Sequence, residues 1–228
     1  MNTTGYSAGD DNSQAMVWEP ECNAMAGRLW RNLHESFVRR SEARRADIRV
    51  VFIGASIVQY WCEEGCRVWD QYYHRNGAVN YGICGDTIQN VLWRVRHRVL
   101  DGLQPRVVVL QCGANNMEPF GRPTDEDIGR GVGQLIGEIR AKLPDAKIIS
   151  VGLMPLSDPQ FTAKARRVNA CIAPFADGKD VHFLDLIPHM TDSDGQQRGE
   201  LFTDGLHLSA EGYAVWHRYM WPVMEKLL

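Results

Sequence analysis

Short apolar runs alternate along the chain with longer stretches that are apolar on one side only. The runs lie at residues 49–53, 79–81, 107–111, 147–151 and 181–184, and the third of them reads VVVLQ. Strands that are buried on both faces of a sheet have this continuous apolar character. We therefore predict five buried strands at these positions.

The stretches between the runs predict helices. Trp30, His34 and Phe37 recur at positions i, i+4 and i+7, which places them on one helical face with His34 as a packing or capping residue. Further helices are predicted at residues 65–75, 87–100, 125–143, 162–175 and 210–227. Thr124 is suited to cap the helix at 125–143, because acidic residues follow it in the first turn.

Strands that alternate with helices predict an α/β fold, in which helices cover both faces of a five-stranded parallel sheet. Residues 1–17 are polar and have little to bury, so we predict a disordered tail there and a single domain over residues 18–228. Ligands in such folds bind beyond the carboxyl ends of the strands. The residues that follow each strand are therefore the place to search for a functional site.

The composition narrows the class of protein. With 44% hydrophobic and 23% charged residues, the chain has the profile of a soluble globular protein with a sizeable core. The net charge of −3 provides no basic field for nucleic acid. No apolar run approaches the roughly 18 residues that a membrane span needs, and the polar N-terminus lacks the features of a secretory signal. We expect a cytoplasmic protein.

The six cysteines form no CxxC pair and are spread over apolar segments. We predict that they are buried free thiols in a reducing compartment. Cys62 and Cys66 are four residues apart, but no second pair of Cys or His nearby completes a metal site, so we predict none.

A serine follows the first predicted strand, in the sequence Gly54-Ala55-Ser56. Taken alone, a serine before a helix is more often a cap than a nucleophile. A nucleophilic serine needs a base within hydrogen-bond reach, and the base needs a carboxylate to orient it. Asp204 and His207 provide such a pair at i and i+3, although a DxxH sequence by itself is also compatible with a surface loop.

Two more strand ends carry groups that could bind an oxyanion. Gly85 could present a backbone N–H to a substrate without a side chain in the way, and Asn115 could present its side-chain amide. Each has an ordinary alternative, because Gly85 also suits a turn and Asn115 a turn or a cap. The coincidence of nucleophile, base and two donors at four strand-end loops favours a serine hydrolase.

Other enzyme classes lack their motifs in this chain. Ser56 is not in a GxSxG sequence, which argues against the α/β-hydrolase type. No GxGxxG follows a strand, and there is no GxxxxGK[ST], so dinucleotide-binding and P-loop sites are not predicted. Gly129, Gly131, Gly133 and Gly137 lie within a helical pattern, where close helix packing accounts for them.

The candidate residues define a mechanism. Ser56 would attack an ester carbonyl while His207 accepts its proton and Asp204 orients the imidazole. The oxyanion would be held by the N–H groups of Ser56 and Gly85 and by the Asn115 side chain. Ile57 and Leu206 flank catalytic residues, and we predict that their bulk limits the acyl chain to a short one.

The chain resembles the SGNH, or GDSL-type, hydrolase superfamily, whose marks are a Ser, a Gly, an Asn and a His in separate blocks. Here these are Ser56, Gly85, Asn115 and His207. The stretches NYGICGDTIQNVLWRV (80–95), CGANN (112–116), DGLHLSAEGY (204–213) and WRNLHESFVRR (30–40) resemble most closely the catalytic alpha subunits of the intracellular platelet-activating factor acetylhydrolases of isoform Ib. The resemblance covers roughly residues 28–228.

This resemblance implies a flavodoxin-like three-layer α/β/α fold and an esterase that uses no cofactor and prefers short acyl chains such as acetyl. A plausible substrate is an acetylated phospholipid such as platelet-activating factor. It also implies homo- or heterodimers with related alpha subunits and binding to a WD-repeat protein. These points rest on analogy.

The chain departs from the family pattern at three positions. Ala55 replaces the Asp of the family's GDS sequence, Cys84 stands where the closest group has a Gly, and Ala114 where it has a Thr. The resemblance implies that this Asp is a hydrogen-bond acceptor that braces the oxyanion loops in the family. Losing a buried acceptor costs about 1–3 kcal/mol, which would slow catalysis roughly 5- to 150-fold. Ala55 therefore predicts a slowed enzyme that is still active.

Two alternatives remain open at this point. Ala55 is compatible with a weakly active or inactive dimeric scaffold that keeps the fold for a binding surface. Within the enzyme class, the alternative is a carbohydrate O-acetylesterase, a role that related SGNH enzymes fill.

Overall fold

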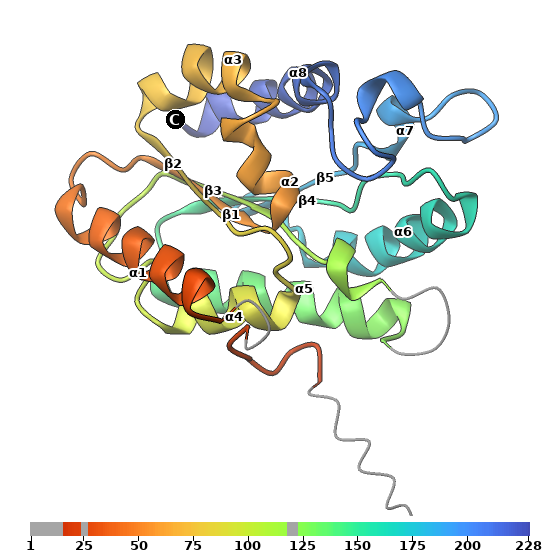
Figure 1. Ribbon diagram of the computed structural model, residues 1–228. Coiled ribbons are helices and arrows are strands. Elements are labelled where there is room, and N and C mark those ends of the chain that lie inside the picture. Colours follow the sequence, from red (N-terminus) through yellow and green to blue (C-terminus); the bar gives the residue numbers. More distant parts are fainter. Residues whose placement is uncertain (1–15, 24–26, 118–122) are drawn as a thin grey trace, which may run out of the picture.

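The computed structural model describes residues 16–23, 27–117 and 123–228 (Figure 1). Five parallel strands form one sheet in the order β2-β1-β3-β4-β5. The strands are β1 (Val50–Gly54), β2 (Ala78–Gly82), β3 (Val107–Gln111), β4 (Lys147–Val151) and β5 (Val181–Leu184). The predicted α/β fold with a five-stranded parallel sheet is confirmed.

Helices cover both faces of the sheet (Figure 1). One face carries α1 (Gly27–Ala43), α4 (Ile88–Arg96), α5 (Asp125–Lys142) and α6 (Pro159–Ile172). The other carries α2 (Ser56–Gln59), η1 (Tyr60–Cys62), α3 (Cys66–Val68), η2 (Trp69–Tyr73), α7 (Ile187–Met190) and α8 (Ala210–Leu227). Short turns of helix lie in the connections: η3 (His74–Asn76), η4 (Ala114–Asn116), η5 (Ala173–Phe175) and η6 (Gly199–Leu201).

The strands are buried on both faces because successive side chains point to opposite sides. In β1, Val51 and Ile53 pack in the core under α1, α4 and α5. Phe52 points to the other side, where its ring centroid lies 5.1 Å from that of Trp69 and 5.0 Å from that of Tyr73. This two-sided burial is the physical reason for the continuous apolar runs in the sequence.

Helix boundaries differ from the predicted ones at three places. The helix expected at 87–100 ends at Arg96, and Arg98 then takes a left-handed conformation with φ of 74°. The segment expected as one helix at 65–75 is divided into an α-helical turn, a π-helical turn and a 3-10 turn. The helix expected at 162 begins at Pro159, because Asp158 caps it and proline suits the first helical position.

The glycines of α5 permit close contact with α6 and the turn after it. A Cβ added at Gly129 would lie 2.5 Å from the Cβ of Cys171, and one at Gly133 would lie 2.2 Å from the Phe175 ring. The predicted packing role is confirmed at these positions. It is wrong for Gly137, where an added Cβ would meet no atom within 4 Å.

Residues 1–15 of the predicted tail lie outside the described residues. Val17, which we assigned to that tail, is only 5% exposed and packs in the core against Gly131 of α5. The folded part therefore begins before residue 18. The single domain predicted over residues 18–228 stays a prediction.

All six cysteines are free, but the prediction that they are buried is wrong for most of them. Cys112, which follows β3, is buried, whereas Cys62, Cys66 and Cys84 are exposed. Cys62 and Cys66 lie in the helical segment after β1, and Cys84 lies in the loop after β2. The apolar character of their neighbours in the sequence did not reveal that these residues are exposed.

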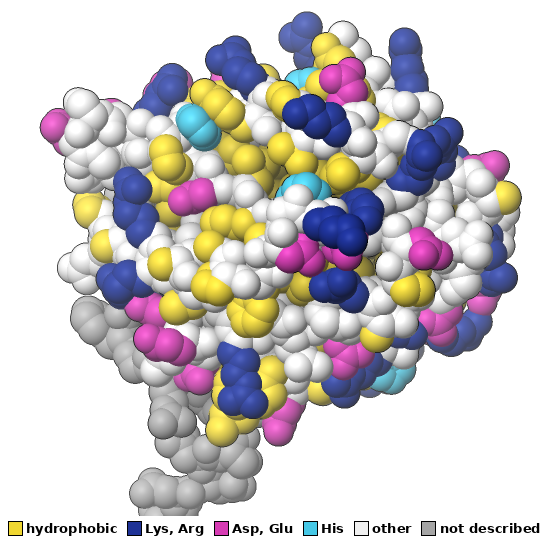
Figure 2. Space-filling model, turned by 180° about the vertical axis from the view of Figure 1, so that it is seen from behind, with side chains coloured by type: hydrophobic (Ala, Val, Ile, Leu, Met, Phe, Trp, Pro, Cys, Tyr) yellow, Lys and Arg dark blue, Asp and Glu magenta, His cyan; other side chains and the backbone are white. Residues whose placement is uncertain are grey.

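The surface carries both signs of charge. On the face shown in Figure 2, Lys and Arg side chains lie among Asp and Glu side chains, and apolar side chains reach the surface between them. Within the described ranges, no helix combines the length and the apolarity needed to cross a membrane.

Candidate active site

The chain turns sharply between β1 and α2, and Ser56 is the first residue of that helix. A Cβ at Gly54 would lie 1.9 Å from the carbonyl oxygen of Gln111 in the neighbouring strand, so only glycine fits at this strand end. β1 lies between β2 and β3, which is where the order of strands reverses. Open α/β sheets bind ligands at such a reversal. The sheet topology therefore places Ser56 at the expected ligand site.

The structure brings Ser56, His207 and Asp204 into one hydrogen-bonded chain. His207 Nε2 lies 3.0 Å from the Ser56 Oγ, and His207 Nδ1 lies 2.6 Å from Asp204 Oδ2. When Nδ1 donates its proton to the carboxylate, Nε2 is left as the acceptor for the serine hydroxyl. The structure thus brings together the three side chains for which the sequence analysis predicted the roles of nucleophile, base and orienting carboxylate.

Asp204 also holds the backbone of its own turn. Its Oδ1 accepts hydrogen bonds from the N–H groups of Leu206 at 3.0 Å and His207 at 2.8 Å. Partial burial raises the pKa of Asp204, but the hydrogen bonds from His207 and Leu206 outweigh it and hold the pKa at about 2. The carboxylate is therefore ionised at neutral pH and can stabilise a protonated imidazole.

The Asp204–His207 turn is fixed by a side chain that the sequence analysis missed. Gln197 donates hydrogen bonds from Nε2 to the carbonyl oxygens of Pro155 and Gly205, each at 2.9 Å. The N–H of Ser157 donates to the same Gly205 oxygen at 3.0 Å. The turn is thus joined to the loop after β4. No local pattern marks Gln197, because its partners lie on other loops.

The predicted oxyanion donors lie in adjacent loops. Gly85 has φ of +80° and no atom near the place of a Cβ, so glycine is needed there for its conformation. Asn115 donates one amide hydrogen to the carbonyl oxygen of Asp86 at 2.9 Å, which leaves its second amide hydrogen for another acceptor. Ser56, as the first residue of α2, has an N–H without an intrahelical acceptor.

A buried ion pair lies directly behind these loops. Arg94 of α4 and Asp86 are 2.8 Å apart, and both side chains are fully buried. Arg94 also donates to the carbonyl oxygens of Tyr81 at 2.8 Å and Gly54 at 2.9 Å, and Asp86 accepts from the Trp30 indole N–H at 2.6 Å. Burial raises the pKa of Asp86, and the contacts with Arg94 and Trp30 oppose that rise. The signal in the sequence was a charged residue on the apolar face of a helix.

The end of α2 and the start of η1 contribute two further contacts. Gln59 Oε1 accepts a hydrogen bond from the N–H of Cys84 at 2.8 Å, and the Tyr60 ring centroid lies 4.9 Å from that of His207. The sequence analysis missed both residues. Their spacing of three and four positions from Ser56, which places them on the same helical face, was the available signal.

The two residues predicted to limit the acyl chain differ in their accessibility. Ile57 is 2% exposed and packs in the core, so it presents almost no surface to a substrate in this structure. Leu206 is half-buried and packs against the same core. The pocket role stays a prediction for both, with Leu206 the more accessible.

Ala55 is 5% exposed and offers no side-chain acceptor. The loops around it are joined by other groups: Gln59 to Cys84, Asn115 to Asp86, and Arg94 to both Asp86 and Gly54. These contacts join the loops of Gly85 and Asn115 without a carboxylate at position 55.

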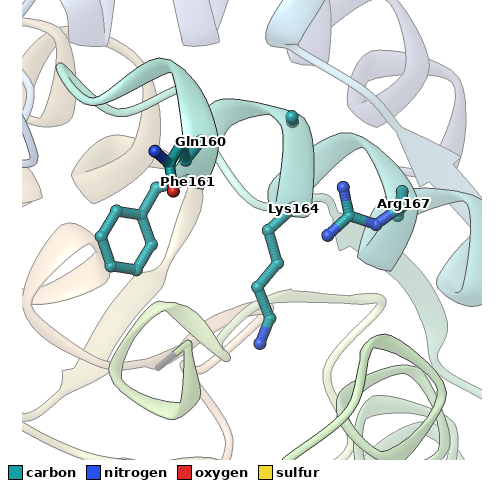
Figure 3. A pocket seen from close by; sticks show the side chains of 5 residues that line it. Gln160, Phe161, Lys164 and Arg167 are labelled. Carbon is teal, nitrogen blue, oxygen red and sulfur yellow. The ribbon is translucent and has the colours of Figure 1, made fainter. Parts of the chain in front are cut away.

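A small pocket on α6 contains none of the candidate catalytic residues. Gln160, Phe161, Ala163, Lys164 and Arg167 line it (Figure 3). Its cations have partners at the start of α5: Lys164 donates to the carbonyl oxygen of Pro123 at 3.2 Å, and Arg167 pairs with Asp125. Among the described residues, no group of three or more His, Cys, Asp or Glu side chains is placed to hold a metal ion.

The chain is similar to known hydrolases in sequence and in fold. Residues 52–215 match the model of the GDSL-like Lipase/Acylhydrolase family. The chain is 32% identical over 224 residues to platelet-activating factor acetylhydrolase IB subunit alpha1 of Bos taurus, covering 97% of this chain and 93% of that protein. A GDSL-like lipase from Bacteroides thetaiotaomicron superimposes with a TM-score of 0.68 at 23% identity, covering 84% and 98% of the two chains. Est24, a carbohydrate acetylesterase from Sinorhizobium meliloti, superimposes with a TM-score of 0.58 at 19% identity, covering 79% of this chain and 100% of that chain.

Proposed function

Because this chain belongs to the GDSL-like lipase/acylhydrolase family and is a carboxylic ester hydrolase, we propose that it removes short acyl groups, chiefly acetyl, by transferring them to Ser56. The observation that carries the proposal is the chain of contacts from Ser56 to His207 at 3.0 Å and from His207 to Asp204 at 2.6 Å. Such a chain activates a serine that would otherwise be a weak nucleophile.

In the acylation step, Ser56 Oγ attacks the ester carbonyl and His207 Nε2 accepts its proton. Asp204 stabilises the imidazolium that forms. The negative charge on the former carbonyl oxygen is held by the N–H groups of Ser56 and Gly85 and by the Asn115 amide. The tetrahedral intermediate then collapses, and the alcohol leaves with the proton that His207 returns.

Deacylation repeats these steps with water as the nucleophile. His207 removes a proton from the water, the same donors hold the second oxyanion, and Ser56 leaves with its proton restored. The products are the free acid and the regenerated enzyme. All of these steps use only side chains, backbone N–H groups and water.

We propose an acetylated phospholipid as the substrate, because the curated relatives are subunits of an enzyme named for platelet-activating factor. Leu206, beside His207, is the accessible apolar residue expected to limit the acyl chain. The alternative is an acetylated carbohydrate, the substrate class in the name of Est24. Measuring kcat/KM of the same enzyme for an acetylated phospholipid and for an acetylated sugar would decide between these two substrate classes.

We also propose that the protein is cytoplasmic and forms dimers, with itself or with a related alpha subunit, and that a WD-repeat protein is its partner. The description of the curated relatives as subunits supports an assembly, whereas the location and the WD-repeat partner rest on the family resemblance. Sedimentation of the purified chain would test self-association, since a purely monomeric species over a micromolar concentration range contradicts a homodimer.

The catalytic assignment is tested by substitution and labelling of Ser56. We expect Ser56→Ala to lose hydrolysis of p-nitrophenyl acetate by several orders of magnitude, and a fluorophosphonate probe to label the parent at Ser56. Ser36→Ala, at a half-buried position of α1 whose hydroxyl bonds only the Leu33 carbonyl oxygen of its own helix among the described residues, is the matched control and should keep both hydrolysis and labelling. Parental hydrolysis by Ser56→Ala would overturn the assignment. A folded parent that takes no label would favour the scaffold alternative.

A further inference from the structure

We infer that Tyr60 is a positioning residue of the active site, which holds the catalytic base with its ring and the oxyanion loop with its hydroxyl group. The inference rests on the proposed function, because it assigns Tyr60 a role toward His207 and the loop of Gly85. Tyr60 follows α2, one helical turn after Ser56, and is half-buried.

The ring of Tyr60 packs against the imidazole of His207. Their centroids are 4.9 Å apart and the planes are inclined by 50°. The distance is within the range over which a cation is attracted to an aromatic ring. During the reaction His207 becomes an imidazolium, so the ring can stabilise the charged base as well as fix its orientation toward Ser56.

The hydroxyl of Tyr60 reaches a different part of the site. It lies 3.8 Å from the Sγ of Cys84, the residue before Gly85, in a weak hydrogen bond. Gln59 accepts the N–H of the same cysteine at 2.8 Å. The backbone and the side chain of Cys84 are therefore both held by the segment that starts at Ser56, which fixes the loop that presents the Gly85 N–H.

The surroundings of Tyr60 favour the neutral form of its hydroxyl group. The hydrogen bond with Cys84, partial burial and the negative charges of Glu63 and Glu64 together raise the pKa of Tyr60 to about 12. His207 itself is faced by Asp204 from its own turn, by Ser56 and Tyr60 from the segment after β1, and through Tyr60 by Cys84. Tyr60 therefore contacts the imidazolium as a neutral ring.

Two substitutions separate the ring from the hydroxyl. Tyr60→Leu removes both, and we expect kcat/KM for p-nitrophenyl acetate to fall about 2- to 30-fold, with the acidic limb of its pH profile moved to lower pH. Tyr60→Phe keeps the ring, so the acidic limb should stay in place while kcat/KM falls by less. Cys84→Ala should match Tyr60→Phe, and combining these two should add no further loss, because both remove the same contact.

Tyr72→Leu is the matched control, because Tyr72 is another half-buried tyrosine whose ring centroid lies 4.1 Å from that of a histidine, His217, on α8. It should leave the pH profile unchanged. An acidic limb that does not move in Tyr60→Leu, or that moves equally in Tyr72→Leu, would overturn the inference.

Measuring Ser56→Ala in parallel distinguishes a failure of the inference about Tyr60 from a failure of the proposed function. If Ser56→Ala is inactive while Tyr60→Leu keeps the parental profile, only the inference about Tyr60 fails. If Ser56→Ala hydrolyses the ester at the parental rate, the proposed function fails and Tyr60 has no catalytic base to position.

Discussion

Replacing Arg94 by methionine should strongly destabilise the fold and disturb the oxyanion loops. The substitution keeps an unbranched side chain, shorter than that of arginine, and removes the contact with Asp86 at 2.8 Å and the hydrogen bonds to the carbonyl oxygens of Tyr81 at 2.8 Å and Gly54 at 2.9 Å. Asp86 would then remain as a fully buried carboxylate without its cation. Breaking one side of such a pair costs about 3–5 kcal/mol, a large part of the roughly 5–15 kcal/mol that stabilises a typical protein.

A double substitution shows whether the cost comes from the unpaired charge. Asp86→Asn keeps an oxygen that can accept the Trp30 N–H but removes the negative charge. In Arg94→Met/Asp86→Asn no buried charge is left, so the loss of stability should be smaller than the sum of the two single losses by more than about 1 kcal/mol.

Urea unfolding followed by tryptophan fluorescence at pH 7 measures these free energies. Hydrolysis of p-nitrophenyl acetate by the folded fraction reports on the site, and Arg94→Met should lower kcat because Asp86 follows Gly85 and its carbonyl holds Asn115. If Arg94→Met costs less than about 1 kcal/mol, or if the single effects add to within about 0.5 kcal/mol, the energetic coupling of the pair is refuted.

Four more predictions follow from the geometry. Asp204→Asn should lower kcat about 10⁴-fold with little change in stability, since the carboxylate orients His207 and is half-exposed; a loss below tenfold contradicts this role. Gly85→Ala should lower kcat by up to about 10²-fold without a steric clash, because only the conformation at φ of +80° resists alanine. Gln197→Ala should lower kcat more than it raises KM, because it frees the Asp204–His207 turn, and an unchanged kcat would argue against this. Burial and nearby Arg94 lower the pKa of His34 from 6.5 to about 4. Neutral His34 therefore contributes stability above pH 6.5, and this contribution is lost as the pH falls toward 4. In urea unfolding, the parent should lose about 2 kcal/mol between pH 7 and pH 5 relative to the His34→Phe variant.

Local sequence was sufficient for the five strands and for the long helices of this fold. The apolar run VVVLQ became β3 with the predicted limits, and the face of Trp30, His34 and Phe37 became the buried side of α1. Burial on both faces gives a continuous apolar run, and burial on one helical face gives a helical period. Both patterns can be recognised without knowing which element packs against the segment. Thr124 capped α5 as predicted because a cap depends on neighbours only three residues away.

The candidate triad could be inferred from sequence because parallel strands end at one edge of the sheet. Ser56 and His207 are 151 positions apart in the sequence, yet both lie at the carboxyl edge of the sheet. Asp204 needed only its local spacing from His207. The strand ends therefore contained the information about which loops would meet.

Only the tertiary structure decided how these residues are supported. The contacts of Arg94 with Asp86, of Gln197 with Gly205 and of Tyr60 with His207 join loops and helices whose relative positions depend on packing, so the sequence does not reveal which residues these side chains contact. The same holds for which thiols are exposed. The sequence by itself determined the order of strands and helices and the chemistry available at the strand ends, because these follow from local burial and residue type. The three-dimensional packing determined which side chains hold that chemistry in place, because contacts between distant segments exist only once the chain has folded.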